Sequence, residues 1–309
     1  MEEKFHLLKV RTFSDVINDS VVFLKKYLRQ IGYVILVLVV PLYIIGSFLQ
    51  SASVSSPFDF TRGSNFVNWG KIGGGSVIGG LLLIFGNALL SLIFISTFLK
   101  VEQSETGEIE SSDIFDGVKE NLGRLLGYYF LVFVALIVIL GLLFLVMAAL
   151  GSISAYAVIV LLGLGLMVGA VYLWVSLAFV TIIYMREMCG IGEAVSRSFY
   201  LIKENFWWTF LILFVALIVA IISGYIFKIP YLIILMVRTI ISASSGREGF
   251  DVSILDRVAL TVGNLGNILT AVVFTIVSFM QYYSLVEKKD GLDLQQQIDN
   301  IGIEENSPN

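Results

Sequence analysis

Hydrophobic residues along this chain gather into six long runs that are separated by short polar segments. Each run approaches or exceeds the roughly 20 apolar residues that an α-helix needs to cross a bilayer. The six predicted crossings cover residues 31–49, 76–99, 127–150, 155–185, 206–227 and 258–286. Only the four residues Gly151–Ser154 separate the third run from the fourth, which predicts a tight helical hairpin. The pattern therefore predicts an all-α polytopic membrane protein whose membrane domain covers residues 31–286.

A seventh, shorter apolar run extends from Pro230 to Ile241 and contains Arg238. Its length of about 12 residues suits an interfacial or re-entrant helix better than a crossing. The alternative is that the fifth helix kinks at Pro230 and continues outward, as proline allows. We favour the interfacial helix at 230–241.

The pattern before the first, third and fifth crossings changes to the spacing of an amphipathic helix. In the third of these stretches Val195, Phe199 and Ile202 share one face, while Glu193 and Arg197 lie on the opposite face. The N-terminal segment 1–30 and residues 111–126 show the same change of character, and Thr12 followed by Asp15 is a capping-box pattern. We therefore predict three hairpins, each preceded by a cytoplasmic surface helix. Either the three units are true internal repeats, or each is the ordinary amphipathic approach of a helix to a membrane.

Composition supports the membrane assignment and charge gives the orientation. Hydrophobic residues make up 57% of the 309 residues and charged residues only 14%, against about 25% charged residues in soluble domains. With both termini in the cytoplasm, the inner segments hold 14 of the 20 Lys and Arg residues, as the positive-inside rule requires. We expect a bacterial cytoplasmic membrane protein with both termini inside. Its acidic tail, residues 287–309, is predicted to be disordered and serves either for solubility or for docking.

Aromatic residues near the ends of the apolar runs match the interfacial belts of membrane proteins. They are Trp69, Tyr128, Tyr129, Tyr184, Trp207, Trp208, Tyr282 and Tyr283.

No constellation of catalytic residues stands out. The chain has one cysteine, Cys189, and one histidine, His6, so neither a zinc site nor a nucleophilic triad is available. We expect no enzyme activity, no cofactor, no metal and no nucleic-acid partner. Acid-base chemistry by Asp59, Glu248 or Asp251 from the outer loops stays conceivable.

Polar side chains within the apolar runs are few. They are Asn87, Arg238, Asn264, Asn267 and Gln281. Amides in such positions join helices by hydrogen bonds more often than they bind substrate. The alternative is a polar cavity, and Arg238 either extends to the outer surface or points into that cavity.

Small residues at helical spacing predict faces of close helix packing. These glycines form the pairs Gly75 and Gly79, Gly165 and Gly169, and Gly263 and Gly266. The faces pack either inside the bundle or against another membrane protein. Further candidates for a partner surface are exposed cations and one aromatic residue, namely Lys25, Arg29, Arg197, Lys203 and Trp69.

Two stretches resemble a family of bacterial integral membrane proteins. They are "RTFSDVINDSVVFLKKYLRQIGYVILVLVVP" and "IGEAVSRSFYLIKENFWWTFLIL", and the ending "QYYSLVEKKDGLDLQQQIDNIG" is similar to uncharacterised Bacteroidota proteins of that kind. The family comprises the membrane domain attached to some glycerophosphodiester phosphodiesterases and its stand-alone relatives. The resemblance implies a six-helix bundle in the inner membrane over residues 10–290. It does not bring the phosphodiesterase, which belongs to a separate soluble domain and needs two histidines.

These observations lead to two functional hypotheses. The first is a non-enzymatic scaffold or subunit of a membrane complex, which engages membrane lipids and another membrane or cytoplasmic protein. The second is a carrier or lipid-handling protein for a neutral or amphiphilic molecule, which would pass through a cavity lined by the internal amides.

Overall fold

The computed structural model describes residues 5–51, 74–150, 156–245 and 253–291, and within these ranges the regular structure is helical. The α-helices are α1 (Phe13–Leu38), α2 (Val40–Ser51), α3 (Gly74–Gln103), α4 (Ser111–Leu150), α5 (Tyr156–Leu177), α6 (Val180–Arg186), α7 (Ile191–Ile202), α8 (Phe206–Tyr225), α9 (Ile229–Ser245) and α10 (Ile254–Asp290). A short 3₁₀ turn, η2 (Ile226–Lys228), joins α8 to α9.

Five of the helical segments are long and apolar enough to cross a membrane, and a sixth is obtained when the bent pair α1–α2 counts as one span. This number agrees with the six predicted apolar runs and identifies an integral membrane protein. The first crossing is broken, because α1 and α2 meet at an angle of 40° at Val39. The bend therefore falls inside the predicted run 31–49.

The amphipathic stretches are helical, but only one forms a helix of its own. α7 ends at Ile202, and a turn precedes α8. In contrast, α1 and α4 continue from their polar starts into their apolar parts without interruption. α1 begins with the predicted capping box, in which the Thr12 amide donates to the Asp15 carboxylate at 3.0 Å. A second capping box, formed by Ser253 and Asp256, starts α10.

The interfacial helix expected at 230–241 is wrong as a separate element. Residues 229–245 continue α8 through η2, so that Phe206–Ile241 forms one apolar segment of 36 residues. Pro230 sits in the first turn of α9, where its missing N–H costs nothing. At about 1.5 Å per residue the segment is about 54 Å long, which exceeds the roughly 30 Å hydrocarbon core. The end of α9 therefore extends past the core or the segment tilts strongly.

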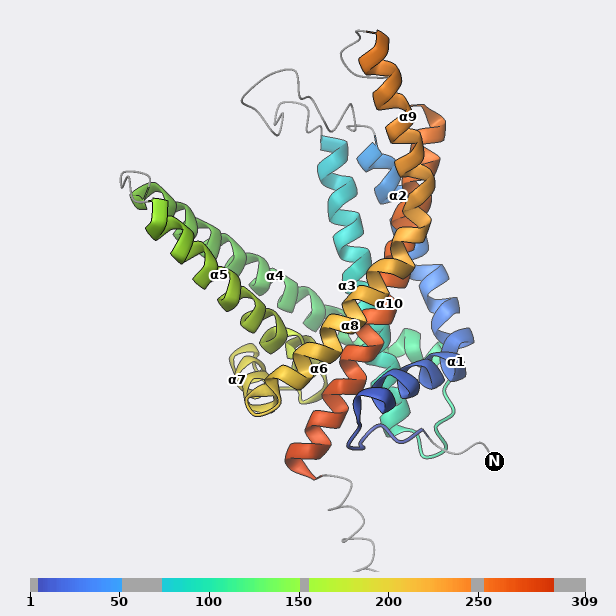
Figure 1. Cartoon of the computed structure of the whole chain (residues 1–309). Coiled ribbons are helices and arrows are strands. Elements are labelled where there is room, and N and C mark those ends of the chain that lie inside the picture. The colour runs from blue at the N-terminus through green and yellow to red at the C-terminus, as the bar shows by residue number, and fades with distance from the viewer. Residues whose placement is uncertain (1–4, 52–73, 151–155, 246–252, 292–309) are drawn as a thin grey trace, which may run out of the picture.

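α10 is the centre of the bundle and runs beside α8 and α9 along its length, with α2 and α3 on another side (Figure 1). Aromatic rings fill the core where α1, α3 and α10 meet. Phe98 stacks on Phe23 with ring centroids 4.3 Å apart and on Tyr283 at 5.7 Å. These rings are fully or almost fully buried, so this contact fixes the three helices against one another.

Helices α4 and α5 form a hairpin that leans away from the rest of the bundle (Figure 1). We call the described apolar part of this hairpin, residues 126–141 of α4 and 165–169 of α5, the arm. Only 6% of the apolar window of α4 is buried, against 50% of the corresponding window of α3. α4 packs on α3 and α1 near its start, where Gly117 lies against Ser96 and the ring of Phe115 lies edge-on to Tyr33, so the hairpin is anchored at one end and leaves the bundle from there.

Candidate functional site

A network of charged and phenolic groups closes one end of the bundle, which we call the polar end. It is formed by Glu102 of α3, Arg186 of α6, Tyr282 and Tyr283 of α10, and their neighbours Glu187, Arg197 and Asp290. The guanidinium of Arg186 donates from Nε and Nη2 to the carboxylate of Glu102, at distances of 2.6–3.2 Å. Such a bidentate pair is stronger and more directional than a single charge contact.

Two tyrosines complete this ion pair. The hydroxyl of Tyr283 donates to Glu102 at 2.8 Å, and Arg186 donates to the hydroxyl of Tyr282 at 3.2 Å. Both rings are fully buried, so the prediction that Tyr282 and Tyr283 belong to an interfacial belt is wrong. Their hydroxyls have partners inside the protein, which explains how two phenols can be buried.

Two more arginines tie the chain together at this end. The guanidinium of Arg124 in α4 donates to the carbonyl of Tyr184 at 2.8 Å and lies over the ring of that tyrosine. Arg11, whose side chain is fully buried, pairs with Asp19 at 2.8 Å, and its backbone N–H donates to Ser284 of α10 at 2.9 Å. The polar end is therefore a cross-linked structural unit in which these cations are used internally.

The amides singled out from the sequence are distributed over several helix contacts. Asn264 in α10 is buried and donates to Ser47 of α2 at 3.0 Å, and Gln281 donates to Thr209 of α8 at 3.2 Å. Asn87 is exposed and donates to the carbonyl of Leu83 in its own helix at 3.0 Å. Asn267 is half-buried and has no hydrogen bond to any residue that the structure describes. These groups do not converge on one cavity.

Arg238 reaches from α9 to the start of α10. Its Nε lies 3.0 Å from the carboxylate of Asp256, whose side chain is 9% exposed, and Nη2 donates to Ser253 at 2.8 Å. Arg238 therefore pins α9 to the start of α10. The contact between Arg238 and Asp256 could not be predicted from the sequence, because a loop separates the two residues.

The predicted glycine faces differ from one another. A Cβ on Gly266 would lie 2.5 Å from the carbonyl oxygen of Gly224, and α8 and α10 approach closely there. Gly263 faces Lys228, Gly79 faces the carbonyl of Gly46 in α2, and Gly75 makes only an ordinary contact with α2. Gly165 and Gly169 have no neighbour within 4 Å in the part of the chain that the structure describes.

The residues of the predicted partner surface differ in exposure and in their contacts. Lys25, Arg29 and Lys203 are exposed, whereas Arg197 is engaged by Glu187 at 3.4 Å and by Asp290. Trp69, Asp59, Glu248 and Asp251 lie outside the described residues, as does most of the tail. The described residues contain no group of three His, Cys, Asp or Glu side chains that suits a metal ion.

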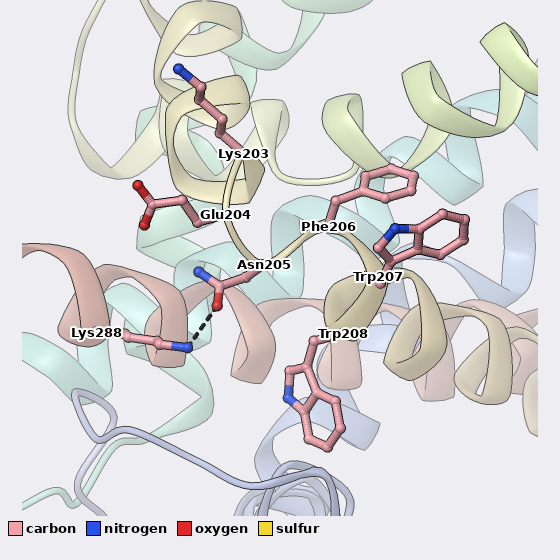
Figure 2. A pocket seen from close by; sticks show the side chains of 7 residues that line it. All are labelled: Lys203, Glu204, Asn205, Phe206, Trp207, Trp208 and Lys288. Atoms are coloured by element: carbon pink, nitrogen blue, oxygen red, sulfur yellow. Dashed lines mark hydrogen bonds between the residues drawn. The ribbon is translucent and has the colours of Figure 1, made fainter.

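An open cavity of about 520 Å³ lies where the turn after α7 meets the start of α8 and the end of α10 (Figure 2). Its lining residues are Lys203, Glu204, Asn205, Phe206, Trp207, Trp208 and Lys288. Lys288 donates to the side-chain oxygen of Asn205 at 2.6 Å. A hydrogen bond from Lys289 lowers the pKa of Glu204, so this carboxylate is already neutralised by a residue outside the cavity.

A second cavity, of about 570 Å³, lies between α1 and the segment before α4. Tyr27 closes it by donating to the carbonyl of Gly107 at 2.7 Å. Its carboxylates include Asp113, which accepts from the backbone N–H of Glu110 at 2.8 Å and starts α4. The hydrogen bond of Asp113 is therefore the ordinary capping contact at the start of a helix.

Comparison with models of protein families, with curated proteins and with solved structures finds no match to this chain.

Proposed function

We propose that this chain is a non-enzymatic scaffold or subunit of a membrane protein complex, which binds a transmembrane helix of its partner against the arm. The proposal includes a bacterial inner membrane location with cytoplasmic termini, so that the polar end faces the cytoplasm. The observation that carries it is the exposure of the arm. In the arm, only 6% of the apolar window of α4 is buried, while α10 packs on six other α-helices.

Helices associate in bilayers mainly through close packing, because lipid tails are as apolar as leucine side chains. A helix hairpin that leaves its own bundle gives up this packing over its length. A partner helix would restore it. Gly165 and Gly169 support this role, since their spacing allows close helix approach and no described residue occupies the space beside them.

The internal polar groups favour this function over the carrier. A carrier for a polar or amphiphilic molecule needs polar groups that face a passage. Asn264 and Gln281 are engaged with neighbouring helices, and Arg238 is paired with Asp256.

Site-specific photo-crosslinking in native membranes tests the proposal. A benzoyl-phenylalanine replaces Phe133 in the arm, which is 58% exposed, or Ile222 in α8, which is 59% exposed. The two positions are matched in exposure and in apolar surroundings. We expect one defined polypeptide to be crosslinked from position 133 and only lipid from position 222. Lipid adducts alone at both positions would contradict the proposal, and so would the same protein adducts from both.

A further inference from the structure

The cavity at the start of α8 has a surplus of positive charge. Lys203 is exposed and has no ion-pair partner among the described residues. Lys288 is held only by the neutral side chain of Asn205. The one carboxylate of the lining, Glu204, is paired with Lys289. The cavity therefore offers two cations whose charges are not neutralised by a described side chain.

Figure 2 shows how these groups are arranged around the turn. Lys288 points towards Asn205 from α10, while Lys203 lies on the other side of the turn and its side chain extends away from both residues. A lysine side chain has four flexible carbons, so its ammonium can swing towards a ligand at low cost. The start of α8 acts in the same direction, because a helix N-terminus carries partial positive charge.

The tryptophans place this cavity at the level of lipid headgroups. Phe206 begins the apolar segment Phe206–Ile241, and the cavity lies directly at this end. Trp207 is 78% exposed, and the ring of Trp208 lies edge-on to Phe13 at 6.4 Å. Exposed tryptophans at the end of an apolar span are typical of the membrane interface, where one side of the ring meets lipid and the other meets water.

We propose that this cavity binds the phosphate of an anionic phospholipid headgroup, with Lys288 and Lys203 as its cationic contacts and Trp207 packing against the acyl chains. The adjoining apolar face of α8, with exposed Leu211 and Phe214, supplies the surface along which the chains lie. A soluble phosphate would use the lysines but would gain nothing from the tryptophan or from this face. The lipid therefore accounts for both parts of the site.

Native mass spectrometry of the purified full-length protein with added lipid tests the assignment. Phosphatidylglycerol is titrated against zwitterionic phosphatidylcholine of the same acyl chains, with and without inorganic phosphate. The variant K203Q/K288Q removes both cations of the cavity. The matched control K25Q/R29Q removes two exposed cations of α1, so it has the same net charge and differs only in where the charge is lost.

We expect phosphatidylglycerol to bind the native protein at least tenfold more tightly than phosphatidylcholine. This preference should fall roughly tenfold in K203Q/K288Q, in keeping with the attraction of each cation near an anionic surface, and should change less than twofold in K25Q/R29Q. Equal losses in both variants would mean general charge attraction and would overturn the site. Displacement of the lipid by millimolar phosphate would assign the cavity to the free anion. Absence of a preference in the native protein would also refute the proposal, and this measurement requires no variant to fold.

Discussion

Replacing Arg186 with methionine should destabilise the polar end, because Glu102 would lose the cation that neutralises it. Methionine is shorter than arginine but keeps an unbranched apolar stem and most of the side-chain volume, so the loss is mainly that of the charge and its hydrogen bonds. Removing one partner of a buried pair costs about 3–5 kcal/mol. The side chains of Arg186 and Glu102 are 13% and 27% exposed, so partial solvation of the remaining carboxylate reduces the expected cost to about 2–4 kcal/mol.

The double variant E102M/R186M separates the loss of an ion pair from the loss of packing. Two apolar side chains leave no uncompensated charge, so its cost should be close to that of a neutral replacement, about 0–1 kcal/mol. Replacing Tyr283 with phenylalanine removes only the hydroxyl that donates to Glu102 at 2.8 Å, which should cost about 1 kcal/mol. Reversible unfolding in mixed micelles with increasing dodecyl sulfate measures all three free energies.

Two results would refute this reasoning. If R186M costs less than about 0.5 kcal/mol, the pair has the small value of a solvent-exposed contact. If the double variant costs the sum of R186M and of the single variant E102M measured in the same way, the side chains act independently and the bidentate geometry has no energetic role.

Three further predictions concern helix packing, thiol reactivity and the ion pair between Arg238 and Asp256. The substitution G266A should destabilise the protein by about 1–3 kcal/mol, because the new methyl group meets the backbone of α8. The control G165A on the arm should be neutral or slightly stabilising. Equal effects of the two substitutions in thermal unfolding would contradict the close approach of α8 and α10. Cys189 should react with iodoacetamide more slowly than a cysteine placed at Lys25, because burial raises the pKa of the Cys189 thiol and only the thiolate reacts. The rate of Cys189 should still rise with pH in the range where the rate of the exposed control levels off. Identical pH profiles for the two cysteines would contradict this environment. Replacing Arg238 with methionine should increase amide hydrogen exchange at the end of α9, and D256N should do the same, whereas an unchanged exchange in both would show that the pair does not hold α9 to α10.

The crossings could be predicted because each apolar run is long enough to span a bilayer by itself. The helix at 229–245 was misassigned for a related reason. Its apolar run is short, and a short run favours a separate interfacial helix. The structure instead continues the run from α8 through η2. Proline tolerates the first turn of a helix as well as a break, so Pro230 could not distinguish the two arrangements.

The polar end could not be predicted, because its contacts join residues far apart in the sequence. Glu102 and Arg186 lie at the ends of apolar runs, where charges are usually solvated, and 84 residues separate them. Tyr282 and Tyr283 have the composition of an interfacial belt, and only the positions of α3 and α6 make them internal. The same holds for Arg238, whose partner Asp256 lies just before the sixth apolar run.

The position of the arm also depends on tertiary structure. Hydrophobicity along α4 and α5 is as high as in the other crossings, so the sequence contains no sign that this hairpin leaves the bundle. The short connection Gly151–Ser154 predicted a hairpin, and α4 and α5 lie side by side in Figure 1. No local pattern in the sequence indicates which other helices α4 and α5 contact.

The central claim is that this protein works as part of a complex. The most direct test is native mass spectrometry after mild extraction from the source membrane at native expression level. The account predicts a second polypeptide in fixed ratio to this chain, which is lost when the apolar residues of the arm are replaced. A chain that is released alone, or with lipids only, would contradict it.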